Sequence, residues 1–182
     1  MKKNKENELK IRNMSRKLRN LFHVGLYLFP AIPILYWLFY NHLSPMMQAG
    51  GFECGAPASL AANSRLIAFA GGIPAIIVIL FTLNSLKALF SFYEKGIYFQ
   101  AENVKQFKVL GKLAVWGVLT DVVNETFLIL AKTINNPPGE KILAIGIGSD
   151  HVKLMVVACI IMLISMVMDE GRKIKDENQL TV

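Results

Sequence analysis

Four apolar stretches, each about long enough to cross a lipid bilayer as a helix, limit what this chain can fold into. They cover residues 21–40, 66–83, 109–131 and 152–168. A helix needs about 20 apolar residues to cross the hydrocarbon core. Backbone groups in lipid must satisfy one another, and none of the stretches alternates polar and apolar residues as a barrel strand does. The sequence therefore predicts an all-α membrane protein with four transmembrane helices.

The composition supports a membrane protein rather than a soluble one. Hydrophobic residues make up 53% of the 182 residues and charged residues only 18%, which is too apolar for an ordinary soluble domain. The formal charge of +7 comes from Lys and Arg placed between the apolar stretches. That placement favours lipid headgroups, and we expect no direct contact with nucleic acid.

Basic residues predict the orientation, because Lys and Arg near helix ends are retained in the cytoplasm. Sixteen of the 20 Lys and Arg residues lie in segments 1–20, 87–112 and 172–175. We therefore predict that both termini are cytoplasmic. The expected organisation is a basic segment 1–20, a transmembrane domain 21–168 and a cytoplasmic tail 169–182.

The basic segment leads into a helical pattern at residues 9–22, where apolar side chains recur at helical spacing among Arg and Lys. We predict an N-terminal interfacial amphipathic helix that contacts anionic headgroups. Two interpretations stay open for it: recognition of an anionic lipid or acidic partner, and a simple orientation signal.

Prolines and glycines interrupt the first two spans. Pro30 and Pro33 fall within the first, and Gly71, Gly72 and Pro74 stand near the start of the second. Because proline removes an intrahelical hydrogen bond, we expect kinks there or a late start of the second helix. The glycine pair would also let a neighbouring helix approach closely.

The third span carries a polar seam. Asp121, Asn124 and Glu125 fall at i, i+3 and i+4 on one helical face, and Lys132 continues the stripe seven residues after Glu125. An Asp at the centre of a span costs about 2.5–3.5 kcal/mol on insertion scales, so the seam must face other helices or water. It is either a proton or cation site with Lys132 as a counter-charge, or a polar contact that joins helices.

Other chemistry is weakly indicated. The three histidines are dispersed, with no metal motif and no third ligand near any of them in the sequence. Cys54 and Cys159 lie far apart and indicate neither a disulfide framework nor a zinc motif. No nucleophile elbow or base partner stands at recognisable spacing. We therefore expect no metal, no cofactor, no catalytic residues and no enzymatic activity.

Two short segments carry a family resemblance. Residues 94–104 read Glu-Lys-Gly-Ile-Tyr-Phe-Gln-Ala-Glu-Asn-Val, and the chain ends in an acidic stretch followed by Leu-Thr-Val. They resemble the DUF2975 family of small bacterial four-helix membrane proteins, in which a Gly-x-x-Phe-x-x-x-Asn type loop precedes the third span. Neither the polar seam nor the loop with Pro45, Cys54 and Pro57 matches the family pattern.

The resemblance implies a multi-pass protein of the bacterial inner membrane, often encoded beside a small Xre-type helix-turn-helix regulator. Both matching segments are predicted to be cytoplasmic, where such a regulator could dock. The docking candidates that this implies are Gly96, Tyr98, Phe99, Glu102, Asn103, Leu180, Thr181 and Val182.

Three functions are therefore open. The first is a non-enzymatic regulatory partner of a helix-turn-helix protein. The second is a small proton- or cation-coupled carrier, or an oligomeric pore, built on the polar seam; it would need a homo-oligomer because four short helices enclose little space. The third is a structural membrane subunit.

Overall fold

Helices make up the regular structure of this chain. The computed structural model describes residues 2–43, 59–98 and 100–180. Within these ranges the elements are five α-helices and one short 3-10 helix, with no strand: α1 (Lys2–Leu28), α2 (Ala31–Phe39), η1 (Tyr40–His42), α4 (Ala62–Glu94), α5 (Ala101–Thr133) and α6 (Ser149–Leu180). The expectation of an all-α fold is confirmed for the described residues.

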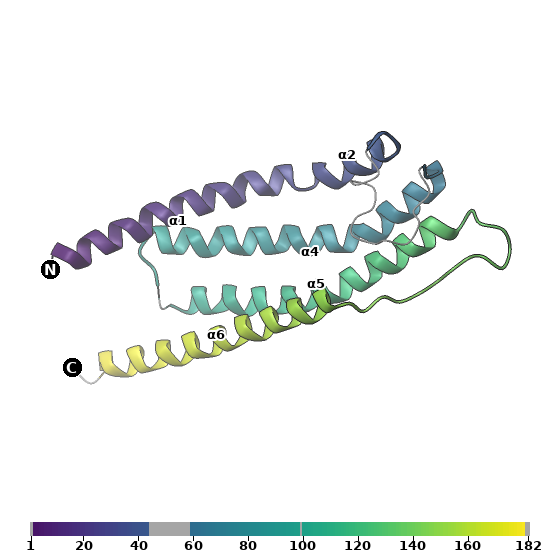
Figure 1. Ribbon diagram of the computed structural model, residues 1–182. Helices are drawn as coiled ribbons and strands as arrows, with labels where there is room; N and C mark the ends of the chain where they lie inside the picture. The colour runs from purple at the N-terminus through teal and green to yellow at the C-terminus, as the bar shows by residue number, and fades with distance from the viewer. Residues whose placement is uncertain (1, 44–58, 99, 181–182) are drawn as a thin grey trace.

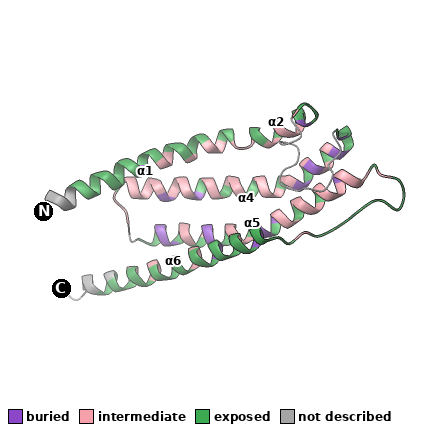
Figure 2. Ribbon diagram, in the orientation of Figure 1, coloured by how far each residue is buried: buried purple, intermediate pink, exposed green. Residues whose placement is uncertain are grey.

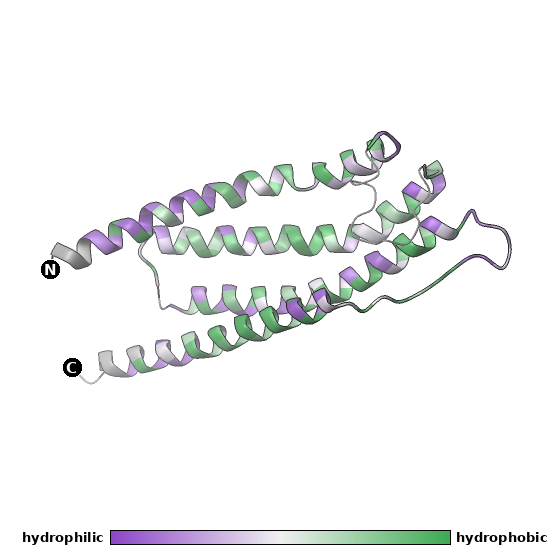
Figure 3. Cartoon of the chain, viewed as in Figure 1, coloured by the Kyte–Doolittle hydropathy of each residue, from purple (hydrophilic) through white to green (hydrophobic). Residues whose placement is uncertain are grey.

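Among the described residues, four helical segments are long and apolar enough to cross a membrane, as many as the predicted spans. They are Glu6–His42, Ala62–Glu94, Ala101–Thr133 and Ser149–Ile174. Apolar residues fill their middle portions, whereas α1 is polar over its first half (Figure 3). Many large apolar side chains in these portions are exposed (Figure 2), as expected of surfaces that face lipid.

The helices stand in an open row. α1 packs against α4, α4 against α5, and α5 against α6, while α2 also touches α4. α1 and α6 form the two edges of this row (Figure 1). The start of α1, the end of α6 and the adjoining ends of α4 and α5 lie at one end, which we call the basic end, and the connection 134–148 reaches the opposite end (Figure 1).

The helices extend beyond the predicted spans. α4 begins at Ala62 rather than near residue 66 and continues to Glu94, and α6 continues to Leu180. Hydropathy marks only the part of a helix that suits lipid, whereas a helix continues into water until its sequence stops it. For α4 the stop is Gly96, whose φ of 77° suits glycine.

Proline breaks the first span as predicted. α1 ends at Leu28 and α2 begins at Ala31, with Pro30 between them. In the second span the late start is wrong, because Pro74 lies inside α4, which bends along its length (Figure 1). α1 has no helix end at residue 20, so the predicted interfacial segment and the start of the first span are one helix. Its location on the headgroups stays a prediction.

Ion pairs join the helices at the basic end. Glu94 of α4 accepts a hydrogen bond from Arg16 Nε at 2.9 Å and pairs with Arg19 at 2.6 Å. Lys108 of α5 pairs with Asp169 of α6 at 3.0 Å. These contacts fix α1 on α4 and α5 on α6 where the apolar stretches end.

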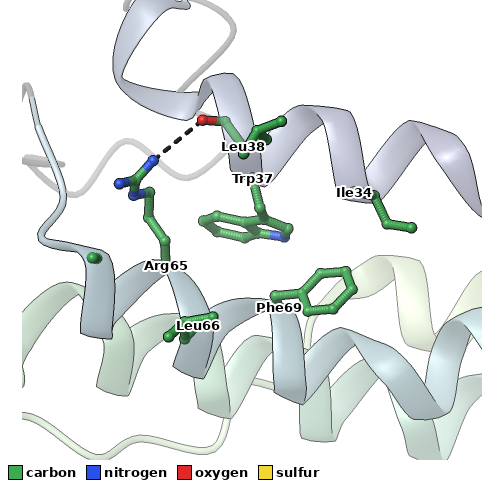
Figure 4. A pocket seen from close by; sticks show the side chains of 7 residues that line it. Ile34, Trp37, Leu38, Arg65, Leu66 and Phe69 are labelled. Atoms are coloured by element: carbon green, nitrogen blue, oxygen red, sulfur yellow. Dashed lines mark hydrogen bonds between the residues drawn. The ribbon is translucent and has the colours of Figure 1, made fainter.

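The opposite end is joined by polar contacts to backbone groups. Arg65 of α4 donates a hydrogen bond to the Leu38 carbonyl at 3.2 Å, beside Trp37 and Phe69, in a cavity of about 310 Å³ (Figure 4). Asn41 both donates to and accepts from the backbone of Leu60. The cavity is lined mainly by apolar side chains and holds no group suited to chemistry.

Candidate functional site

A polar cluster joins α5 to α6. Asp121 and Glu125 lie one turn apart on α5, and His151 is the third residue of α6. His151 Nε2 is 3.6 Å from Asp121 Oδ2 and 3.9 Å from Glu125 Oε2. One ligand atom of each residue lies within 4.8 Å of the others. We call these three residues the acidic-histidine cluster.

Burial differs strongly within the acidic-histidine cluster. The side chain of His151 is 4% exposed, that of Glu125 is 18% exposed, and that of Asp121 is 46% exposed. His151 Nε2 is buried and has no partner within hydrogen-bond distance among the described residues. The cluster is therefore closed behind the imidazole and open beside Asp121, so a small species can enter from that side.

The backbone of Gly148 orients the imidazole. Its N–H donates to His151 Nδ1 at 3.0 Å. His151 therefore accepts from the residue before the helix, as the Glu of a capping box does. Because Nδ1 accepts, a neutral imidazole must carry its hydrogen on Nε2, directed at the two carboxylates.

A glycine and a threonine let the connection pass close to the cluster. A Cβ on Gly146 would lie 2.8 Å from Glu125 Oε2, so any larger residue would push the carboxylate away. Thr133 Oγ1 accepts from the Ile142 N–H at 3.1 Å, which fastens the connection to the end of α5. The chain thus returns along α5 and starts α6 at the level of the carboxylates.

The predicted seam divides into two faces. Asn124 and Lys132 line a cavity of about 390 Å³ with residues of α2 and α4, whereas Asp121 and Glu125 face α6. A Cβ on Gly72 would lie 3.2 Å from Asn124 Oδ1. Lys132 forms no ion pair with either carboxylate of the seam among the described residues, so its expected role as their counter-charge is wrong. On a helical wheel Lys132 lies closer in direction to Glu125 than to Asn124, so the spacing alone does not predict this separation.

The charges at the start of α6 also separate. Lys153 pairs with Asp150 at 2.7 Å, and both side chains are largely exposed. His151 lies between them in the sequence and instead faces Asp121 and Glu125. The expectation that no further ligand lies near any histidine is wrong in space. Distance along the chain hid it, because His151 and Glu125 belong to different helices.

A metal ion fits the acidic-histidine cluster poorly. Histidines that bind metals almost always donate a hydrogen bond from the other ring nitrogen. In this cluster the other nitrogen, Nδ1, accepts a hydrogen bond from Gly148. A metal on Nε2 would then require either a fully deprotonated ring or loss of the Gly148 contact. The arrangement suits an Nε2–H donor beside two acceptors.

The docking candidates at the basic end have mixed surroundings. Asn103 is fully buried, and its amide donates to the carbonyls of Ile97 at 2.8 Å and Tyr98 at 2.7 Å. Tyr98 packs on Tyr93, with 5.8 Å between ring centroids. Gly96 supplies the turn, and Glu102 is exposed in the first turn of α5.

The remaining docking candidates lie at the limit of the described residues or outside them. Leu180 is the last residue of α6. Phe99, Thr181 and Val182, like Cys54 in the connection before α4, lie outside the described residues.

A family model described as a protein of unknown function, DUF2975, matches residues 55–182. The chain belongs to the DUF2975 family. The match covers the second, third and fourth spans, and with them the acidic-histidine cluster and the 95–100 connection. This confirms the resemblance that was read from two short segments. No curated protein and no solved structure matches the chain significantly.

Proposed function

We propose that this DUF2975 protein is a non-enzymatic membrane protein that takes up a proton at the acidic-histidine cluster. The observation that carries the proposal is the buried imidazole, whose Nε2 faces Asp121 and Glu125 at 3.6 and 3.9 Å while Gly148 occupies Nδ1. Two carboxylates in one site repel each other, and a proton shared between them removes that repulsion. A metal ion could bind Nε2 only by displacing the hydrogen that this nitrogen carries in the neutral ring.

Coupling of this proton to transport would need more than one copy of the chain. The four spans form an open row, and a row cannot enclose a pathway alone. We therefore propose a homo-oligomer in the bacterial inner membrane, with both termini in the cytoplasm and the acidic-histidine cluster towards the outer side. The position of 16 basic residues at the basic end supports this orientation.

The experiment measures proton uptake by infrared difference spectroscopy on protein in lipid nanodiscs. A pH jump should produce a carboxylic acid band that disappears in Asp121→Asn/Glu125→Gln. The matched control is Asp150→Asn, which removes a neighbouring carboxylate that pairs with Lys153 outside the cluster, and it should retain the band. An unchanged band in the double variant would remove the proposal and favour a structural membrane subunit.

Flux tests the coupling separately. Liposomes containing the wild-type protein should acidify in response to a proton gradient faster than liposomes containing the double variant. A cluster that takes up a proton without any difference in flux would leave the proton site standing and end the carrier or pore.

A second candidate is the regulatory partner of a small Xre-type helix-turn-helix protein. The observation that favours it is that the 95–100 connection and the end of α6 lie at the same end of the molecule (Figure 1), so that one partner could reach both. Exposed Glu102 is the best described contact, because its neighbour Asn103 in the first turn of α5 is fully buried. Co-purification with the neighbouring regulator should be lost on deleting residues 169–182, and full retention would end this candidate.

A further inference from the structure

A polar pocket lies between α1 and α4 near the basic end. It has a volume of about 470 Å³, within the range of small-molecule sites. Its lining residues are Arg19, Asn20, His23, Asn84, Lys87, Ala88 and Ser91. These residues recur at helical spacing on each helix, so one face of α1 and one face of α4 form the two walls.

Packing on either side holds the two walls at a fixed distance. Phe22 stacks on Phe90 at the level of the pocket, with 5.5 Å between ring centroids, and towards the middle of the span a Cβ on Gly25 would make ordinary contact with Leu83. Towards the basic end, Glu94 binds Arg19 and Arg16. The pocket is therefore built before any ligand arrives.

The lining is rich in hydrogen-bond donors and contains no carboxylate. Lys87 makes no hydrogen bond or ion pair within the described part of the chain, and neither do the side chains of Asn84 and Ser91. Asn20 uses its oxygen to accept from Arg19, which leaves its NH₂ group for another partner. An acceptor-only anion, such as a phosphate, satisfies this set of donors.

The position of the pocket indicates the source of that phosphate. Leu21 begins the first apolar stretch and Leu83 ends the second, so the pocket lies where the lipid headgroups are expected. Beyond it, exposed apolar side chains continue the same face towards the middle of the spans: Tyr27 and Leu28 on α1, and Ile77 and Phe81 on α4. A polar pocket followed by an apolar stripe matches a phospholipid headgroup followed by its acyl chains.

We infer that this pocket binds one anionic phospholipid, with its phosphate between Arg19 and Lys87. This site is separate from the acidic-histidine cluster and does not depend on the proposed proton uptake. It also differs from general attraction between a basic surface and a charged membrane, since it assigns a particular role to Lys87 that other cations at the same end do not share.

Native mass spectrometry of the delipidated protein, titrated with phosphatidylglycerol or phosphatidylcholine, tests the site. Lys87→Gln should weaken phosphatidylglycerol binding by about tenfold or more, the loss expected for a direct charge-assisted contact. The matched control is Lys95→Gln, which removes an exposed cation of the same end outside the pocket, and its binding should change by less than about threefold. Equal losses in the two variants would overturn the inference.

A second variant and a competitor make the result independent of folding. Asn84→Asp places a negative charge at an exposed position of the wall and should weaken phosphatidylglycerol binding as Lys87→Gln does, with an unchanged helical circular dichroism spectrum. Inorganic phosphate should fail to displace the lipid, because it lacks the acyl chains that contact the apolar stripe. Displacement by phosphate alone, or equal binding of phosphatidylcholine, would overturn the assignment to an anionic lipid.

Discussion

The contact between α4 and α5 depends on a glycine that no larger residue can replace without moving a helix. A Cβ built on Gly71 would overlap Cβ of Phe127 and lie 2.6 Å from its Cγ. Non-bonded carbons prefer separations of about 3.5–4.0 Å. Since Phe127 Cβ is attached directly to the backbone of α5, a change of rotamer cannot relieve the overlap. Gly71→Ala must therefore separate the two helices by roughly 1 Å.

The expected magnitude follows from two opposing terms. Overpacking of this kind costs about 1–3 kcal/mol. Replacement of glycine by alanine in a helix interior stabilises the folded state by up to about 1 kcal/mol. Gly171→Ala isolates the second term, because a Cβ on Gly171 of α6 meets nothing within 4 Å. The free energy of unfolding of Gly71→Ala should therefore lie about 1–3 kcal/mol below that of Gly171→Ala.

The assay is reversible unfolding in mixed micelles with increasing denaturing detergent, followed by circular dichroism. Two second-site variants sharpen it. Phe127→Ala keeps the Cβ that overlaps, so it should not rescue Gly71→Ala fully, whereas Phe127→Gly should. If Gly71→Ala is as stable as Gly171→Ala, or if Phe127→Ala rescues it as well as Phe127→Gly does, the described contact between α4 and α5 is refuted.

Three further changes test other parts of the structure. Asn103→Ala removes two hydrogen bonds to backbone carbonyls from a fully buried site and should lower the free energy of unfolding by about 1–3 kcal/mol; an unchanged value in the same unfolding assay would contradict its role in the 95–100 connection. Gly111→Ala should cost less than Gly71→Ala, because its Cβ would meet Cγ of the flexible Met162 at 2.9 Å, and the reverse order would be evidence against the packing of α5 on α6. In a cysteine-free background, Glu140→Cys should react with an impermeant thiol reagent from outside intact cells and Lys95→Cys only after lysis; the opposite pattern would reverse the proposed orientation.

Sequence reasoning predicts the spans because their cause is local. Each apolar stretch must be helical in lipid whatever its neighbours are, and proline acts on its own helix. The break between Leu28 and Ala31 and the turn at Gly96 can be predicted from the sequence for the same reason. The extension of α4 to Glu94 was not, since hydropathy does not distinguish a helix end from the membrane boundary.

Only part of the candidate site can be predicted from the sequence. Asp121 and Glu125 stand out because carboxylates are costly in a span and share one face of α5. His151 is distant in sequence, and only the path of the 134–148 connection brings it to them. A usable signal was present, however: Gly146 and Gly148 directly precede His151, and small residues allow a chain to pass close to a side chain such as Glu125.

The division of the seam follows from helix order. Asn124 and Asp121 share a face on a helical wheel, but α5 lies between α4 and α6, so that neighbouring positions on the wheel meet different helices. One sequence does not reveal which helices flank α5. The helical wheel therefore placed Lys132 with Asp121 and Glu125, whereas in the structure it lines a different cavity.

Nitrogen-15 NMR of His151 in lipid bilayers tests the central claim most directly, because it reports which ring nitrogen carries the hydrogen. We predict a hydrogen on Nε2, an Nδ1 that carries no hydrogen and accepts from Gly148, and an Nε2 signal that shifts in Asp121→Asn/Glu125→Gln but not in Asp150→Asn. A hydrogen on Nδ1, or an Nε2 signal that ignores both carboxylates, would contradict the proposed proton site.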